Sequence, residues 1–60
     1  MSYTFKIGTD LIGNLSFDTI SVAQDYIDDN EITDDLIRIE TIYGYIFVDY
    51  FDIDIVENVT

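Results

Sequence analysis

The sequence predicts a small α+β domain, in which one helix packs on a mainly antiparallel sheet in the order β-α-β-β(-β). Three patterns carry this prediction. Residues 3–7 alternate between apolar and polar side chains, residues 17–29 repeat apolar side chains at spacings of three and four, and residues 36–56 are rich in β-branched and aromatic side chains. The length of 60 residues predicts a single small acidic domain, residues 1–60.

The first element is a half-buried strand at residues 3–7, whose odd positions face the core and whose even positions, Thr4 among them, face away from it. Turn signals follow at residues 8–10 and 13–14, where glycine stands next to threonine, asparagine or aspartate. We expect residues 10–15 to form a loop, with a short return strand as the alternative.

The second element is an amphipathic helix. Ser16 is a good N-cap residue, and the helix is expected to end near Asn30, which suits a left-handed C-terminal position. Asp28 and Asp29 lie at the negative end of the helix dipole, where each costs about 0.3–1 kcal/mol at low salt. Either these charges serve a function other than stabilising the helix, or the exposed helix end tolerates them. The face toward the sheet is expected to carry Phe17, Ile20, Ala23, Gln24 and Ile27.

A hairpin follows an acidic connector at residues 31–35. Residues 36–42 and 45–50 are its strands, and Tyr43-Gly44 is the expected two-residue turn. This turn sets a register that places Arg38 opposite Asp49. The side toward the helix then carries Ile37, Ile39, Thr41, Ile46, Val48 and Tyr50.

The alternation slips after this hairpin, because even positions are apolar up to Tyr50 and odd positions are apolar from Phe51 onward. A slip of one residue turns every following side chain to the other face, so a bulge or corner is expected at residues 50–52. Residues 51–56 then form either a bent continuation of the hairpin strand or a separate strand.

The outer face of the hairpin is more apolar than a solvated sheet face should be. We expect it to be covered by residues 11–15, by a second copy of the chain in a homodimer, or by a partner. Its apolar side chains are Leu36, Ile42, Tyr45, Phe47 and Phe51.

The charge balance restricts the partners. Thirteen acids stand against Lys6 and Arg38, which gives a net charge of −11. Such a chain repels nucleic-acid phosphates and anionic membranes, so direct binding to either is not expected. A basic partner is favoured, such as the basic groove of a nucleic-acid-binding protein or enzyme. Because the chain has no cysteine or histidine and no catalytic motif, we expect neither an enzyme nor a cofactor.

The candidate binding residues are carboxylates that replace nucleic-acid phosphates, because acids two apart on a strand or three to four apart on a helix lie several ångströms from one another. Tyr43, near the turn, is the candidate apolar anchor. A calcium loop starting at Asp28 fails at Ile32 and Thr33, so no metal site is predicted. The candidate phosphate mimics are Asp25, Asp28, Asp29, Asp34, Asp35, Asp49, Asp52 and Asp54.

In size and charge the chain resembles the small acidic proteins that phages and mobile elements use against restriction enzymes, CRISPR effectors or DNA-repair glycosylases. This resemblance implies a non-enzymatic inhibitor that mimics DNA. It aligns no residues, so it assigns no functional positions. Since residues 1–7 lack the features of a secretion signal, a cytoplasmic location is expected, in the host cell if a phage encodes the protein. The alternative function is a structural or assembly protein that oligomerises through its aromatic sheet face, with the acids serving solubility.

Overall fold

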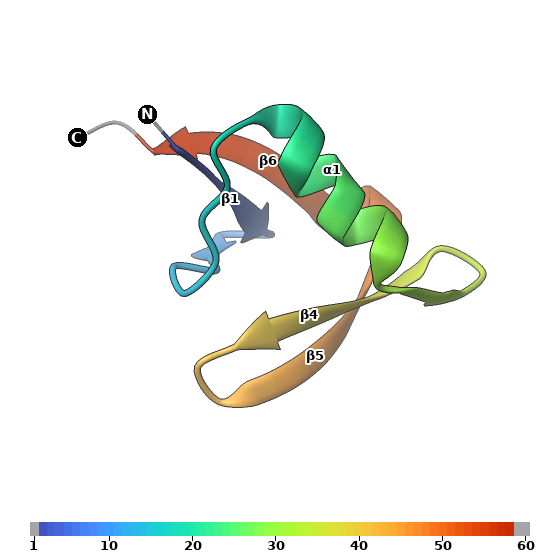
Figure 1. The fold of residues 1–60 in the computed structure, drawn as a ribbon. Helices are drawn as coiled ribbons and strands as arrows, with labels where there is room; N and C mark the ends of the chain where they lie inside the picture. Colours follow the sequence, from blue (N-terminus) through green and yellow to red (C-terminus); the bar gives the residue numbers. More distant parts are fainter. Residues whose placement is uncertain (1, 59–60) are drawn as a thin grey trace.

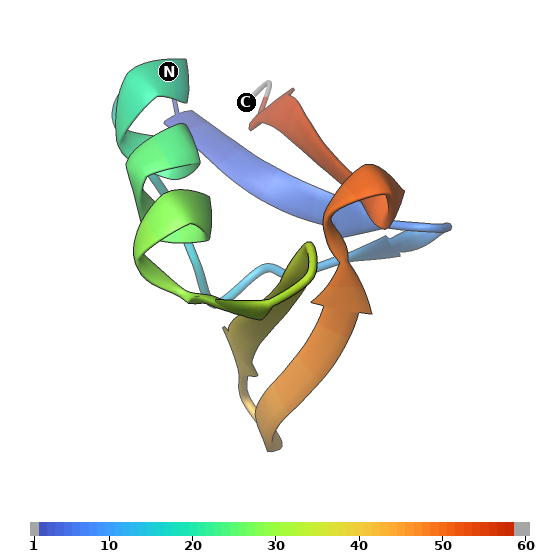
Figure 2. The ribbon, with the colours of Figure 1, turned by 90° about the vertical axis from the view of Figure 1, so that its right-hand side faces the viewer.

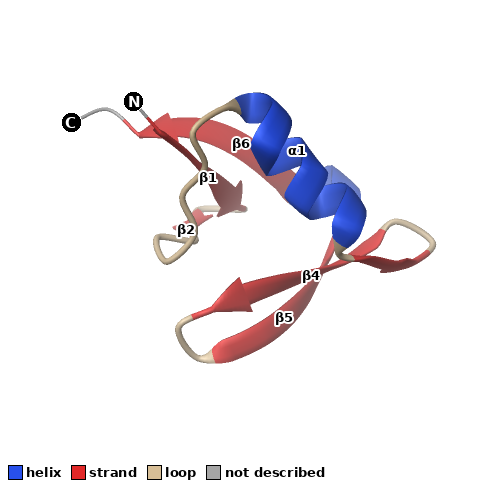
Figure 3. Ribbon diagram, viewed as in Figure 1, coloured by secondary structure: helices blue, strands red, loops and turns tan. Residues whose placement is uncertain are grey.

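Two small antiparallel sheets and one helix make up the fold, which confirms the predicted α+β class. The computed structural model describes residues 2–58. The sheets have the strand orders β2-β1-β6 and β3-β4-β5, where a single sheet had been predicted (Figure 1). In chain order the elements are β1 (Ser2–Ile7), β2 (Asp10–Leu11), α1 (Ile20–Asp29), β3 (Glu31–Thr33), β4 (Leu36–Thr41), β5 (Gly44–Asp49), the short 3-10 helix η1 (Tyr50–Asp52) and β6 (Ile53–Asn58) (Figure 3).

The first sheet is built on β1, which confirms the predicted strand. It pairs along its whole length with β6, from Ser2 opposite Asn58 to Ile7 opposite Ile53. On its other side it pairs with β2, so the predicted loop at residues 10–15 begins with a two-residue strand. Within this sheet the first and last strands of the chain lie side by side (Figure 1).

The helix begins three residues later than the apolar spacing predicts. Thr19, not Ser16, is the N-cap residue, and its Oγ1 accepts a hydrogen bond from the Val22 amide at 3.1 Å. Phe17 fits the helical spacing, but its amide and carbonyl both bond to the backbone of Tyr3, at 2.8 Å each. The end at Asp29 is as predicted, although Asn30 takes a φ of −108° and is not left-handed.

Residues 31–35, which the sequence predicts to be a connector, belong to a second hairpin. Glu31–Thr33 forms β3 and pairs with β4. The turn between them consists of Asp34 and Asp35, whose φ angles are 45° and 65°. Aspartate is one of the few residues other than glycine that tolerates this left-handed conformation, which explains how two acids can make the turn.

The register of the β4–β5 hairpin differs by two residues from the predicted one. Thr41 pairs with Gly44, so the turn is Ile42-Tyr43, and Arg38 lies opposite Phe47 where Asp49 had been expected. The Thr41 side chain stabilises this turn, because its Oγ1 donates to the Gly44 carbonyl at 2.7 Å and accepts from the Tyr43 amide at 3.1 Å. A shift of two residues preserves the faces, so the predicted sides are correct within β4 and β5. Tyr50 and Phe51, which were assigned to the inner and outer sides, lie in η1 and not in the sheet.

The expected corner after β5 is present as η1. The Asp49 carboxylate accepts a hydrogen bond from the Phe51 amide at 2.9 Å and starts this turn of 3-10 helix. The chain then leaves the second sheet and enters the first as β6, a separate strand. The slip in the sequence pattern therefore marks the point at which the chain passes from one sheet to the other.

The core lies where α1 and the two sheets meet. The buried ring of Phe5 belongs to the core, and the partly buried rings of Phe17 and Tyr26 pack against it. The ring centroids are 5.1 Å apart for Phe5 and Phe17, 5.6 Å for Phe5 and Tyr26, and 5.4 Å for Phe17 and Tyr26. Thr4 is also buried, although the alternation in β1 assigned it to the outer side. No helix in residues 2–58 has the length and apolar character needed to cross a membrane. The buried apolar residues are Phe5, Ile12, Ala23, Ile27, Ile37 and Ile39.

Candidate functional site

All eight predicted phosphate mimics are exposed. Three lie on α1 (Asp25, Asp28 and Asp29), two form the β3–β4 turn (Asp34 and Asp35), and one each lies at the end of β5 (Asp49), in η1 (Asp52) and in β6 (Asp54).

Hydrogen bonds around Tyr50 bring several of these segments together. The Tyr50 amide donates to the Asp35 carbonyl at 2.7 Å and ties η1 to the β3–β4 turn. Gln24 on α1 donates to the Asp28 carboxylate at 3.1 Å, and its amide nitrogen lies 3.4 Å from the Tyr50 hydroxyl. The C-terminal half of α1, the β3–β4 turn and η1 therefore meet at one end of the molecule, which faces the viewer in Figure 2.

We call this region the acidic end. Its carboxylates come from the last turn of α1, the β3–β4 turn, the end of β5 and η1. Glu31, the first residue of β3, follows the helix C-cap residue Asn30 and is exposed, so it is an acid close in sequence to this region. The sequence placed Glu31 in the acid-rich region but not among the binding residues. The acidic end comprises Asp28, Asp29, Asp34, Asp35, Asp49 and Asp52.

Two of the eight predicted phosphate mimics lie outside the acidic end. Asp25 is one helical turn before Asp28 and Asp29 and extends the negative charge along α1. Asp54 is separate, because in the β1–β6 ladder it lies directly opposite Lys6. A base across the strand offsets the charge that Asp54 can present to a partner.

Neither basic side chain belongs to the acidic end, although Arg38 borders it, because Arg38 lies diagonally across the β4–β5 ladder from Asp49. Lys6 is in β1, opposite Asp54. Arg38 is in the middle of β4, with its guanidinium carbon 4.5 Å from the centroid of the Tyr45 ring, a cation–π geometry. The segments that form the acidic end therefore carry no base of their own, and Arg38 is a neighbour on the side of Asp49.

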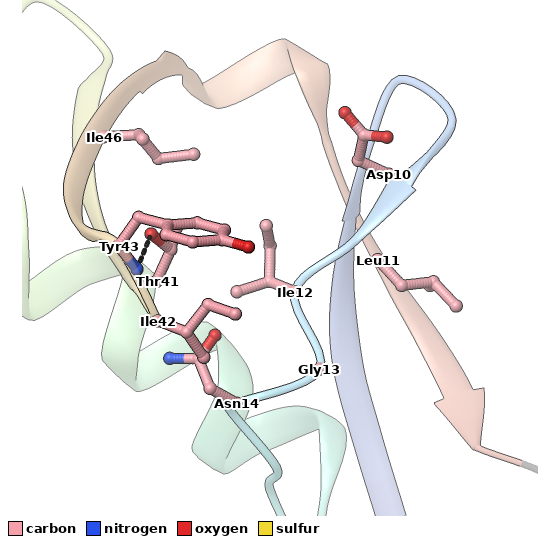
Figure 4. A pocket seen from close by; sticks show the side chains of 9 residues that line it. All are labelled: Asp10, Leu11, Ile12, Gly13, Asn14, Thr41, Ile42, Tyr43 and Ile46. Atoms are coloured by element: carbon pink, nitrogen blue, oxygen red, sulfur yellow. Dashed lines mark hydrogen bonds between the residues drawn. The ribbon is translucent and has the colours of Figure 1, made fainter.

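Tyr43, the predicted apolar anchor, is 93% exposed at the tip of the β4–β5 hairpin. It borders a groove of about 560 Å³ between the hairpin tip and residues 10–14, and its ring points into this groove on the side of Ile12 (Figure 4). The tip and Asp49 are at opposite ends of β5, roughly 17 Å apart at 3.4 Å per residue. The structure thus separates Tyr43 from the acidic end. The groove is lined by Asp10, Leu11, Ile12, Gly13, Asn14, Thr41, Ile42, Tyr43 and Ile46.

The outer face of the second sheet is the other unusual surface. Tyr45 is 57% exposed and Phe47 59% exposed, so residues 11–15 do not cover them as one of the expectations held. Arg38 and Glu40 of β4 lie opposite these two rings in the ladder. This face therefore presents aromatic rings bordered by charges, a composition common at protein interfaces.

Exposed carboxylates can bind metal ions or basic side chains. In the described part of the chain, the acids form no group of three that could hold a metal ion. Spread and exposed carboxylates can accept hydrogen bonds from arginine and lysine side chains of another protein. Comparison of the chain with protein-family models, with curated proteins and with solved structures found no match.

Proposed function

We propose that this protein is a non-enzymatic inhibitor that mimics nucleic-acid phosphates and occupies the basic nucleic-acid site of a host protein or enzyme. The proposal rests on one observation, that six exposed carboxylates gather at the acidic end from segments that carry no base. Its targets would be of the restriction, CRISPR or DNA-repair type, and its place of action the cytoplasm, that of the host cell if a phage encodes it.

Binding would be electrostatic and hydrogen-bonded. Each carboxylate of the acidic end would accept bonds from an arginine or lysine that normally contacts phosphate. Because the partners are oppositely charged and exposed, attraction would speed their encounter and weaken as salt screens it. The protein would compete with nucleic acid for the same basic groove.

Some of these acids occupy positions where another residue is the more usual choice, which supports a role for their charge. Asp28 and Asp29 lie at the C-terminal end of α1, where the helix dipole disfavours negative charge. Asp34 and Asp35 both have positive φ, where glycine or asparagine would be the more usual choice. Acids retained at such positions are readily explained if a partner requires them.

Two variants of equal charge test the proposal. The first neutralises the acidic end through Asp28→Asn, Asp35→Asn, Asp49→Asn and Asp52→Asn. The second neutralises acids elsewhere through Asp10→Asn, Asp18→Asn, Glu40→Gln and Glu57→Gln. Each set removes four acids and takes the net charge from −11 to −7, so non-specific attraction is matched.

The immobilised chain and both variants are exposed to a bacterial lysate treated with nuclease. We expect the unmodified chain and the second variant to retain nucleic-acid-binding proteins that elute with salt and that duplex DNA displaces. The first variant should lose most of this capture, by at least about tenfold, since several charge-assisted hydrogen bonds of about 1.5–3 kcal/mol are lost. Equal capture by the two variants, or capture that DNA and salt do not affect, would contradict mimicry.

A second candidate function is assembly through the aromatic sheet face. The exposure of Tyr45 and Phe47 favours it, because large apolar side chains adjacent in a sheet usually meet another surface. In that case the acids would serve solubility, and the substitutions at the acidic end would leave the biological activity intact.

A further inference from the structure

Strand β5 is an edge strand with free hydrogen-bonding groups. Among residues 2–58 it is the last strand in the order β3-β4-β5 and pairs only with β4. Along β4 the Arg38 and Glu40 amides bond away from β5, to the Asn30 carbonyl and the Tyr26 hydroxyl. Successive residues of a strand point their backbone groups to opposite sides, so the backbone groups of the odd-numbered β4 residues, Ile37, Ile39 and Thr41, are directed to β5. Their partners in β5 are even-numbered, which leaves the backbone groups of Tyr45, Phe47 and Asp49 directed to the open edge.

The other edges in the described chain are protected where β5 is not. Beyond the short β3, the backbone of β4 at Glu40 is closed by the Tyr26 hydroxyl, at 3.1 Å from the amide, and by the Asn14 side chain, at 2.9 Å from the carbonyl. β6 carries Asp54 and Glu57, and charged side chains discourage strand pairing. β5 instead contains an uncharged run of five residues, residues 44–48, before Asp49.

We propose that two copies of this chain pair antiparallel along β5, with the two-fold axis at Phe47. In this register Phe47 faces Phe47 of the second copy, and Tyr45 faces its Asp49. All three outward-directed residues then exchange hydrogen bonds with outward-directed residues, as an antiparallel ladder requires. The β3-β4-β5 sheets of the two copies become one sheet of six strands. The rings of Tyr45 and Phe47 from both copies lie on one face of it.

Charge distribution along β5 selects this antiparallel arrangement. Asp49 at the C-terminal end of β5 belongs to the acidic end, whereas Ile42, Tyr43 and Gly44 at the other end are uncharged. Antiparallel pairing sets the acidic end of one copy beside the uncharged hairpin tip of the other. The two Asp49 residues are then four positions apart, about 14 Å at 3.4 Å per residue. This exceeds the Debye length of about 10 Å at 0.1 M salt, so their repulsion is largely screened.

The same charges favour a second copy over an extended segment of another protein at this edge. A register that pairs Phe47 with itself places no two like charges opposite each other. Asp49 of the second copy would lie beside Tyr45, whose ring already contacts the Arg38 guanidinium at 4.5 Å. The Arg38 guanidinium is thus placed to attract Asp49 of the second copy, so this chain carries both charges that the interface needs.

The oligomeric state tests the interface. The unmodified chain should sediment as a dimer, and Phe47→Asp should weaken the dimer at least about tenfold, because it places two carboxylates opposite each other at the axis. Phe51→Asp is the matched control: Phe51 is 78% exposed but lies in η1, so this variant should remain a dimer. Circular dichroism of both variants establishes that they fold. A chain that is monomeric up to millimolar concentration would overturn the proposal.

A cysteine substitution tests the register even if Phe47→Asp fails to fold. The chain has no cysteine, so Phe47→Cys introduces a single thiol. Opposed residues of a hydrogen-bonded antiparallel pair have Cα atoms about 5.5 Å apart, within the range of a disulfide. Phe47→Cys should therefore cross-link into a covalent dimer on mild oxidation. Tyr45→Cys, whose copies would be about 14 Å apart, should not. Rapid cross-linking of Tyr45→Cys alone, or of neither variant, would overturn the register.

Salt separates this proposal from the proposed function. Pairing of two acidic chains should strengthen as salt screens their net repulsion, whereas binding to a basic target should weaken. Dimerisation that weakens between about 0.05 and 0.5 M salt would count against the β5 interface and leave the mimicry proposal intact. Loss of target binding on neutralising Asp28, Asp35 and Asp52 alone, with Asp49 retained because it lies in the β5 interface, would likewise be independent of the dimer.

Discussion

Thr4 is the residue whose position the sequence pattern most clearly misjudges. Alternation in β1 places it on the outer side, yet it is 2% exposed. Its Oγ1 lies 2.7 Å from the Ile12 carbonyl and 2.6 Å from the Leu15 carbonyl, so the hydroxyl supplies the loop with a donor where water has little access. These carbonyls are 8 and 11 residues away along the chain, and a period-two pattern contains no information about them.

Thr4→Val should destabilise the protein by about 1–3 kcal/mol, because it keeps the shape of the side chain and leaves a buried carbonyl without its donor. Thr33→Val is the control, since Thr33 is exposed in β3 and should change the free energy of unfolding by less than about 0.5 kcal/mol. Urea denaturation of both variants measures the difference. A Thr4→Val variant as stable as the unmodified chain would mean that the hydroxyl contributes nothing to holding the loop.

At the scale of elements, residue types and their spacing predict the strands and faces better than the ends. Ile37, Ile39 and Val48 lie on the inner side as expected, although the hairpin register is shifted by two residues. The shift arises because the Thr41 side chain organises the turn one residue earlier than Gly44 suggests, a local hydrogen bond that composition does not reveal. The helix start was misplaced for a similar reason, since the backbone of Phe17 is engaged by Tyr3.

The β3–β4 turn offers a test of whether its acids are structurally favourable. Both turn residues have positive φ, so the double substitution Asp34→Asn with Asp35→Gly should suit the backbone better than two aspartates do. The matched control is Asp34→Asn with Asp35→Asn, which removes the same two charges without introducing a glycine. We expect the glycine-containing variant to unfold at higher urea concentration, by roughly 0.5–1 kcal/mol, because the cost of a left-handed residue exceeds the entropy cost of glycine.

Equal stability of these two variants would show that asparagine fits the second turn position as well as glycine does, and a comparison of the asparagine variant with the unmodified chain extends the test to aspartate. The positive φ angles of Asp34 and Asp35 would then give no support to a functional reason for their charge. A more stable glycine variant that captures fewer target proteins would instead show stability and binding in opposition at one turn. Such opposition is common where binding residues are retained at a cost to the fold.

At the scale of the whole molecule, the sequence predicts the class of the fold but not the grouping of its strands. The slip at Tyr50-Phe51 indicated a corner, and only the pairing of β6 with β1 shows that the corner joins two sheets. The acidic end has the same origin, because α1, the β3–β4 turn and η1 meet through contacts between residues far apart in the sequence. Charge counting predicts that acids are abundant, whereas their gathering depends on the tertiary structure.

The net charge of −11 predicts a stability that rises with salt, since all the acids are exposed and repel one another in the compact state. Measured where the chain is monomeric, the melting temperature should increase between about 0.02 and 0.5 M sodium chloride, as the Debye length falls from roughly 20 Å to about 4 Å. Two variants of net charge −7, one neutralised at four acids of the acidic end and the other at four distant acids, show where the repulsion is concentrated. If the acidic end concentrates it, neutralising that end should remove more of the salt dependence than neutralising the four distant acids. Equal salt dependence in the two variants would mean that the negative charge acts as if spread evenly over the molecule, and an evenly charged surface would not resemble a phosphate backbone to a basic groove.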